Sequence, residues 1–299
     1  MATLIRQTYR PFTEAGAGPS CLLIGAAIFA TWLPSLAIGE ILLHDKWIDG
    51  SRAEANLPKE AAVWVGRKND VTVKPGSLST AMTPASQKIW TYFTDKDPVT
   101  LRVGEKLTAS VSFIPRGALS ESTSRSFRVG LFHDATNPRV DTDVNSDAGG
   151  DEAPWTDANG YAVQVLMTGG EYSGTKPFDL GKRTNLESQS LLGTSGDYTK
   201  VSGGEPVALE LDKQYTVTLQ IHRVAEAQID LTSDYRQGDQ ILSTWTVTDD
   251  RNYLGTDAIY DKFDLLYIRI SNNTTTADRI DFTSFKVELG PAEVGQRAE

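Results

Sequence analysis

Apolar and polar residues alternate along most of the chain beyond residue 100. A period of two places every second side chain on one face, as in a half-buried β-strand. No window after the N-terminal segment keeps helical spacing for more than about three turns. We therefore predict an all-β protein, with strands in these runs: Leu107–Phe113, Phe127–Leu131, Tyr161–Met167, Tyr215–His222, Leu242–Val247, Asp264–Ile270 and Ile280–Leu289.

Gly, Pro, Asn and Asp separate these runs, and these residues supply the backbone conformations that tight turns require. The last two runs flank the polar segment Ser271–Thr276, which predicts a hairpin there. Many strands without interleaved helices favour stacked antiparallel sheets over a parallel α/β sheet. The predicted fold is a two-sheet antiparallel jelly-roll sandwich.

Each predicted strand has a core face and a second face, and a curved jelly-roll sheet leaves the second face as a groove. Apolar residues occupy the first face of three of the runs, and the residues between them are polar or aromatic. We predict that the intervening residues line one groove that binds a ligand, and they are Arg128, Gln220, His222, Tyr267 and Arg269.

The first 37 residues have the features of a signal peptide. Arg6 and Arg10 precede the apolar run Cys21–Leu33, and small residues follow as far as Ala37. We predict cleavage near Ala37, with Gly39 as the alternative, then one domain over 40–290 and a flexible tail over 291–299. An uncleaved anchor is less favoured because the apolar run is short for a bilayer. The predicted location is periplasmic, cell-surface or extracellular, with no membrane insertion after cleavage.

Composition and charge exclude several classes of function. The only cysteine, Cys21, lies in the leader, so disulfides, thiolate metal sites and cysteine nucleophiles are absent from the mature chain. A formal net charge of −10 argues against nucleic acid as a partner, because phosphate binding requires clustered Lys and Arg. An apolar content of 39% is enough for a globular core.

Several segments carry a resemblance to a known family. The segments His44–Arg52, Val63–Val65, Phe127–Phe132 and Ile280–Val287 resemble the concanavalin A-like, laminin-G-like jelly-roll domains of secreted bacterial proteins. The resemblance spans essentially the whole mature chain. It implies a non-catalytic extracellular domain that binds a polysaccharide or glycan, and a structural envelope or matrix role is a further alternative.

A second resemblance is local. Gln220-Ile-His222 resembles a tripeptide of jelly-roll alginate lyases. It implies a uronate lyase acting by β-elimination, in which Arg128 and Gln220 neutralise the uronate carboxylate, His222 or Tyr267 removes the C5 proton, and Tyr267 protonates the leaving oxygen. Arg125-Ser-Phe-Arg128 lacks the Glu of the family's Arg-rich strand. The lyase is therefore the alternative function.

An acidic loop has the spacing of a calcium site. Five oxygen-bearing residues occupy places one, three, five, seven and twelve of the EF-hand pattern. Ser146 stands where that pattern has Gly, so a solvated acidic loop is the alternative. The predicted ligands of a structural Ca²⁺ are Asp141, Asp143, Asn145, Asp147 and Glu152.

Two aromatic residues lie in Gly- and Asp-rich stretches, where a ring is harder to bury than in a strand. Such rings stack on the apolar face of a sugar. We predict that Trp155 and Tyr172 bind carbohydrate in this way. The other tryptophans of strand-like runs are predicted to be core residues: Trp47, Trp64, Trp90 and Trp245.

Overall fold

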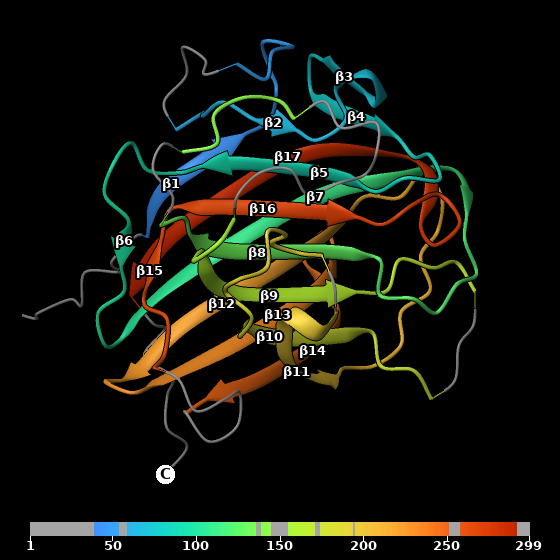
Figure 1. The fold of residues 1–299 in the computed structure, drawn as a ribbon. Coiled ribbons are helices and arrows are strands. Elements are labelled where there is room, and N and C mark those ends of the chain that lie inside the picture. Colours follow the sequence, from blue (N-terminus) through green and yellow to red (C-terminus); the bar gives the residue numbers. More distant parts are fainter. Residues whose placement is uncertain are drawn as a thin grey trace, which may run out of the picture. The chain divides into compact units, whose positions relative to one another are not determined.

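Two antiparallel β-sheets lie face to face in the computed structural model (Figure 1). The structure describes residues 39–53, 59–135, 139–144, 155–170, 174–193, 195–250 and 258–291. The chain forms two units, Met1–Leu36 and Ala37–Glu299. The first unit, which holds most of the predicted signal peptide, lies outside the described residues, as does the predicted tail beyond residue 291.

One sheet has eight strands in the order β14-β13-β12-β7-β17-β4-β3, and β1 also pairs with β17. This sheet pairs strands that are far apart in the sequence, because β1 lies next to β17. The bounds are β1 (Glu40–Asp45), β3 (Val71–Lys74), β4 (Ser77–Ala81), β7 (Glu105–Leu119), β12 (Tyr215–Ala225), β13 (Gln228–Gln237), β14 (Gln240–Asp249) and β17 (Ala277–Pro291).

The other sheet has seven strands in the order β11-β10-β9-β8-β16-β5-β2. Its strands are β2 (Trp64–Val65), β5 (Gln87–Tyr92), β8 (Phe127–His133), β9 (Asn159–Val165), β10 (Phe178–Arg183), β11 (Tyr198–Gly203) and β16 (Leu265–Ile270). A short pair and two 3-10 helices complete the elements: β6 (Val99–Thr100), β15 (Lys262–Phe263), η1 (Lys68–Asp70) and η2 (Ser195–Asp197). The predicted two-sheet antiparallel sandwich is confirmed.

The main core lies between the sheets, and the alternation predicted its members correctly. Phe127, Val129 and Leu131 are fully buried there, which turns Arg128 to the outer side of the sheet. The inward residues of the other two runs are confirmed as well: Val217, Leu219, Ile221, Leu266, Ile268 and Ile270.

A second apolar cluster covers the outer side of the seven-stranded sheet. It joins side chains of the sheet to those of the segments that cross over it. Its members include Trp90, Phe132, Trp155, Leu191, Leu192 and Tyr267. The outer face of this sheet is therefore partly roofed rather than open along its whole length.

The predicted hairpin over Ser271–Thr276 is wrong. β16 pairs with β5 and β8 in the seven-stranded sheet, whereas β17 pairs with β7 and β4 in the other. The polar segment carries the chain from one sheet to the other, and its hydroxyls bond within it, as Thr276 Oγ1 donates to the Asn272 carbonyl at 2.6 Å. A turn-forming composition specifies a change of direction but not the sheet in which the next strand pairs.

Within the described residues, no helix is both long enough and apolar enough to cross a membrane.

Candidate functional site

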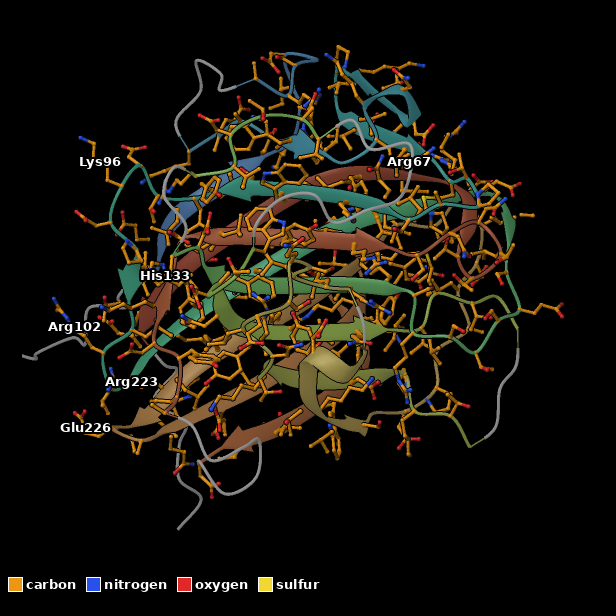
Figure 2. All side chains as sticks on the ribbon, in the orientation of Figure 1. Arg67, Lys96, Arg102, His133, Arg223 and Glu226 are labelled. Carbon is orange, nitrogen blue, oxygen red and sulfur yellow. The ribbon has the colours of Figure 1, made fainter. Side chains whose placement is uncertain are left out.

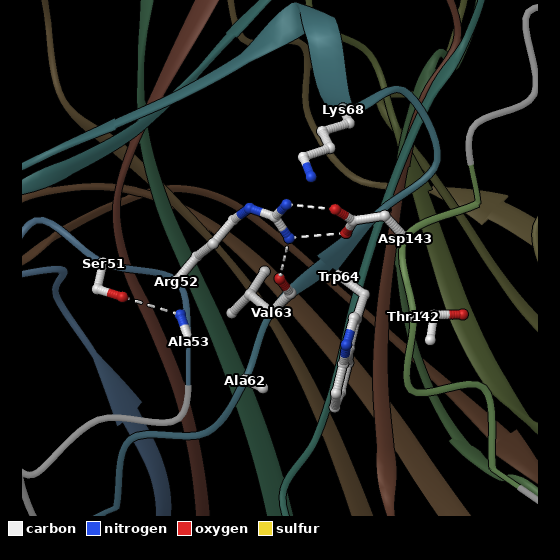
Figure 3. A pocket seen from close by; sticks show the side chains of 9 residues that line it. All are labelled: Ser51, Arg52, Ala53, Ala62, Val63, Trp64, Lys68, Thr142 and Asp143. Atoms are coloured by element: carbon white, nitrogen blue, oxygen red, sulfur yellow. Dashed lines mark hydrogen bonds and ion pairs between the residues drawn. The ribbon is translucent and has the colours of Figure 1, made fainter.

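An open pocket of about 590 Å³ lies at the edge of the seven-stranded sheet. Three segments form it: the stretch after β1, the region of β2 and η1, and the segment 139–144. Figure 3 shows the residues that line it: Ser51, Arg52, Ala53, Ala62, Val63, Trp64, Lys68, Thr142 and Asp143.

Trp64 provides the aromatic wall of this pocket. Its neighbours Val63 and Val65 are buried in the main core, so the pleat of the strand directs the indole to the outer side. The ring stays partly exposed and packs edge-on against Tyr92, with the centroids 5.9 Å apart. Trp64 was predicted to be a core residue, and in this respect the prediction is wrong.

Arg52 and Asp143 form the polar wall. The Arg52 guanidinium donates to both carboxylate oxygens of Asp143, with 2.7 Å from Nη1 to Oδ1. Nη1 also donates to the Val63 carbonyl at 2.8 Å, and the Val65 N–H donates to Asp143 Oδ1 at 3.1 Å. Burial would raise the pKa of Asp143, but these hydrogen bonds and the charge of Arg52 lower it below its ordinary value. The pair therefore fixes β2 and the segment 139–144 together as charged partners.

Cationic and hydroxyl groups complete the lining. Lys68 is exposed on η1, and in Figure 3 its side chain extends toward the Arg52–Asp143 pair. The hydroxyl of Thr142 is exposed on the opposite wall. The nine lining residues therefore offer hydrogen-bonding groups, charges of both signs and an aromatic surface.

A hydrogen-bond network holds the segment 139–144 over the sheet. The Trp90 indole N–H donates to the Val140 carbonyl at 2.9 Å, and the Val140 N–H donates to the Tyr92 hydroxyl at 3.1 Å. Tyr92 donates in turn to Asp134, and Arg139 lies 4.5 Å above the Tyr92 ring. Burial and the hydrogen bond to Asp134 raise the pKa of Tyr92, so the phenol stays protonated as a donor. The pocket is thus built on a preformed wall.

Trp155 does not provide a sugar-stacking surface. It is only 1% exposed, and its ring packs edge-on against Trp90 at 5.9 Å and against Tyr267 at 5.5 Å. The prediction of an exposed loop aromatic is wrong because the outer face of the sheet is itself apolar here and buries the ring. The other predicted aromatic, Tyr172, lies outside the described residues.

The predicted single groove is also wrong. Arg128, Tyr267 and Arg269 lie on β8 and β16 of the seven-stranded sheet, whereas Gln220 and His222 lie on β12 of the eight-stranded sheet. Their outer faces are on opposite sides of the sandwich. Periodicity assigns each side chain to the outer face of its strand correctly, but it does not say to which sheet the strand belongs.

Gln220 and His222 belong to a different surface. Gln220 lines a shallow groove of about 310 Å³ with Lys106, Thr108 and Glu288. His222 lies opposite Lys106 on one side and Asp230 on the other, and burial lowers its pKa. With Arg128 and Tyr267 on the far side of the sandwich, the four residues predicted for a lyase do not meet around one sugar.

The predicted calcium loop is described only in part. Asp141 is exposed, and both oxygens of Asp143 are engaged by Arg52. Asn145, Asp147 and Glu152 lie outside the described residues. The described part of the chain contains no cluster of three or more His, Cys, Asp or Glu residues suited to a metal ion. Calcium binding by this loop stays a prediction.

Comparisons with solved structures find similarities at low sequence identity. No protein-family model and no curated protein matches the sequence. The VIP36 exoplasmic/lumenal domain, in its Ca²⁺/Man2-bound form, is similar with a TM-score of 0.47 at 9% identity, over 83% of this chain and 88% of that one. The Emp47p carbohydrate recognition domain gives 0.45 at 8% identity, over 85% and 97%. Peanut lectin gives 0.42 at 11%, over 79% and 95%. The fold assignment rests on the two sheets described above.

Proposed function

We propose that this domain is a non-catalytic carbohydrate-binding domain and that the Trp64 pocket holds the sugar. The observation that carries the proposal is a partly exposed indole facing a pocket whose other walls bear a guanidinium, an ammonium and a hydroxyl. An aromatic face binds the C–H face of a sugar ring, while convergent polar groups bond its hydroxyls. The volume of the pocket lies within the range of about 300–1,000 Å³ usual for small-ligand sites.

The groups lining the pocket support binding rather than cleavage. Asp143 is the only carboxylate among them, and its bidentate contact with Arg52 keeps it ionised and occupied. General acid–base catalysis would need a base that is free to reach the sugar, and the Asp143 carboxylate is held by Arg52. A lyase is not proposed, since no described face of the sandwich unites Arg128 with His222.

The predicted export fits this proposal, because an exported domain meets polysaccharides and glycans outside the cytoplasm. A structural Ca²⁺ would serve it by ordering the acidic loop that follows Asp143. The VIP36 structure is named as a Ca²⁺/Man2-bound form. That name describes VIP36, and the proposal for this chain rests on the Trp64 pocket.

The test is retention on a panel of immobilised polysaccharides and glycans. Wild-type protein is expected to be retained by at least one of them, and Trp64→Ala is expected to weaken that retention by about tenfold, because stacking contributes about 1–2 kcal/mol. Trp64→Phe keeps an aromatic face and should retain most of the binding. Ile48→Ala, at a residue that is 62% exposed outside the pocket, is the control. Unchanged retention of Trp64→Ala would contradict the proposal.

A further inference from the structure

Two arginines face each other on the outer side of the seven-stranded sheet. Arg128 of β8 and Arg269 of β16 are direct partners in the register of neighbouring strands. Lys88 of β5 is the next residue in the same row, opposite Arg269. Three cationic side chains therefore occupy adjacent strands at one level of the face that also carries Trp64. Strand β5 is the direct neighbour of β2, and β16 and β8 lie two and three strands away from it.

The two guanidinium groups share a neutral partner. Arg128 Nη1 donates to the carbonyls of Leu192 and Gly193, and Arg269 Nη1 donates to the same Leu192 carbonyl at 2.8 Å. Arg269 Nη2 also reaches Ser86 Oγ at 3.5 Å. The buried Nε atoms of both arginines have no hydrogen-bond partner in the described structure. These Nε atoms are enclosed by the protein, so the donor that remains open to a ligand is Arg128 Nη2, which makes no hydrogen bond to a described residue.

No described carboxylate forms an ion pair with either arginine. The nearest acid along the row is Asp179, beyond Gln164 of β9. Its carboxylate is engaged by Arg125 at 3.2 Å and by Lys200 at 3.0 Å. Asp179 is therefore the shared counterion of two other cations.

The juxtaposition of Arg128 and Arg269 is electrostatically unfavourable without an anionic partner. Like charges directly opposite each other on one sheet face destabilise the pair, and a partly buried cation is costly unless it is paired. Burial and the charge of Arg269 lower the pKa of Arg128 to about 10, which means that the charged form of Arg128 is disfavoured at this position. An anion bridging the two groups would relieve it.

We propose that Arg128 and Arg269 form a binding site for an oxyanion, namely the carboxylate or sulfate group of an acidic sugar. A planar guanidinium presents paired N–H donors that match the oxygens of a carboxylate or sulfate, and two of them can hold one such group. The site lies on the same outer face as the Trp64 pocket. It rests on the proposed function in one respect, in that it extends the sugar site and specifies an acidic glycan.

The test compares three probes by calorimetry on the full chain: galacturonate oligomers, their methyl esters, and sodium sulfate against sodium chloride of equal ionic strength. Galacturonate is expected to bind at least tenfold more tightly than its ester, and sulfate is expected to bind above the chloride baseline. Arg128→Gln and Arg269→Gln should each weaken the binding of galacturonate and of sulfate by about tenfold or more, as expected for loss of a charge-assisted contact. Their binding of the ester should not change.

Further variants separate a lost site from a lost fold. Arg128→Lys keeps the charge but loses the planar fork, and it should bind sulfate with intermediate affinity. Arg102→Gln removes one exposed positive charge at the margin of the molecule (Figure 2) and should leave all three probes unaffected. Circular dichroism confirms that each variant is folded before binding is measured.

The two proposals fail separately. Trp64→Ala should weaken the binding of galacturonate without affecting the binding of sulfate. If Trp64→Ala binds galacturonate as wild type does while the arginine variants no longer bind it, the proposed sugar pocket is wrong and the oxyanion site stands. Sulfate binding without galacturonate binding would restrict the ligand to sulfate. The oxyanion site is overturned if wild-type protein binds neither anion above its control, or if Arg128→Gln and Arg269→Gln bind both as wild type does.

Discussion

Lys182 Nζ lies 3.1 Å from Oδ2 of Asp249, and neither side chain is exposed to solvent. Lys182 belongs to β10 of the seven-stranded sheet and Asp249 to β14 of the eight-stranded sheet, so this ion pair joins the two layers through the core. The Tyr161 hydroxyl donates to the same oxygen at 2.7 Å, and Lys182 Nζ lies 5.0 Å from the centre of the Tyr260 ring. Each charged group is thus stabilised by the other in place of water.

Removing one partner of this pair should be much more harmful than removing both. Lys182→Met is expected to lower the free energy of unfolding by about 3–5 kcal/mol, because Asp249 is left charged and buried. Lys182→Met/Asp249→Asn should recover a large part of the loss, since the Asn oxygen still accepts from Tyr161. Urea unfolding measures both, with Lys262→Met at an exposed position as the control. A double variant as unstable as the single one would refute this account.

Asp45 predicts a pH dependence of stability. Burial, together with the charges of Glu60 and Asp49, raises its pKa to about 6, against the opposing effect of the Trp47 N–H donor. The native state therefore binds this proton more tightly than the unfolded state, and the contribution of Asp45 to stability decreases as pH rises from about 4 to about 6. Asp45→Asn should be more stable than wild type by about 2–3 kcal/mol at pH 7.5.

The same variant at low pH provides the check. At pH 4 the native carboxyl is already protonated, so the stability difference between Asp45→Asn and wild type should nearly vanish. Chemical unfolding at both pH values measures this, and Asp239→Asn in an exposed turn is the matched control. A stability gain of the same size at both pH values would show that the charge of Asp45 is not its cause.

The Arg52–Asp143 pair and the predicted calcium loop can be separated by thermal unfolding. Asp143→Ala should lower the melting temperature in EGTA as well as in calcium, because Arg52 and the Val65 N–H lose their acceptor under both conditions. Calcium should raise the melting temperature of the wild type if the loop binds the ion, and Asp141→Ala should remove that increase. Equal melting curves in calcium and EGTA would mean a solvated loop.

Gly203 provides a packing test beside Trp245. A Cβ atom at this position would come within 2.0 Å of the indole ring, which packs directly over the glycine. Gly203→Ala should therefore lower the free energy of unfolding by about 1–3 kcal/mol. Gly76→Ala is a poor control, because Gly76 has a φ of +87°; Ala53→Gly in an exposed segment is preferable. A stability equal to wild type would require Trp245 to move without cost.

The sequence predicted which face of each strand is buried better than it predicted which strands pair with each other. Alternation placed Phe127 inside and Arg128 outside, because the pleat of a strand determines both from local pattern alone. It did not reveal that β8 and β12 lie in different sheets, because their sheet membership depends on distant partners, such as Arg269 for Arg128 and Val111 for Val217. The Ser271–Thr276 hairpin failed for the same reason.

The two tryptophan errors have different physical causes. Trp155 follows a stretch of loop composition, yet the segment packs onto an apolar sheet surface that the sequence does not disclose. Trp64 has strand composition, but its flanking valines occupy the core face and leave the indole on the other. The Val63-Trp64-Val65 alternation contained that information, and it outweighs residue type as a guide to exposure.

The pairing of β1 with β17 affects the order in which the eight-stranded sheet can form. β17 lies between β7 and β4 and also holds β1, so the eight-stranded sheet lacks an interior strand until residue 291 is available. The contacts of this sheet therefore span almost the whole described chain, and strand pairing over such separations is slow to form. We therefore expect β17 to complete the eight-stranded sheet in a late step of folding, and refolding of the purified domain to be slow.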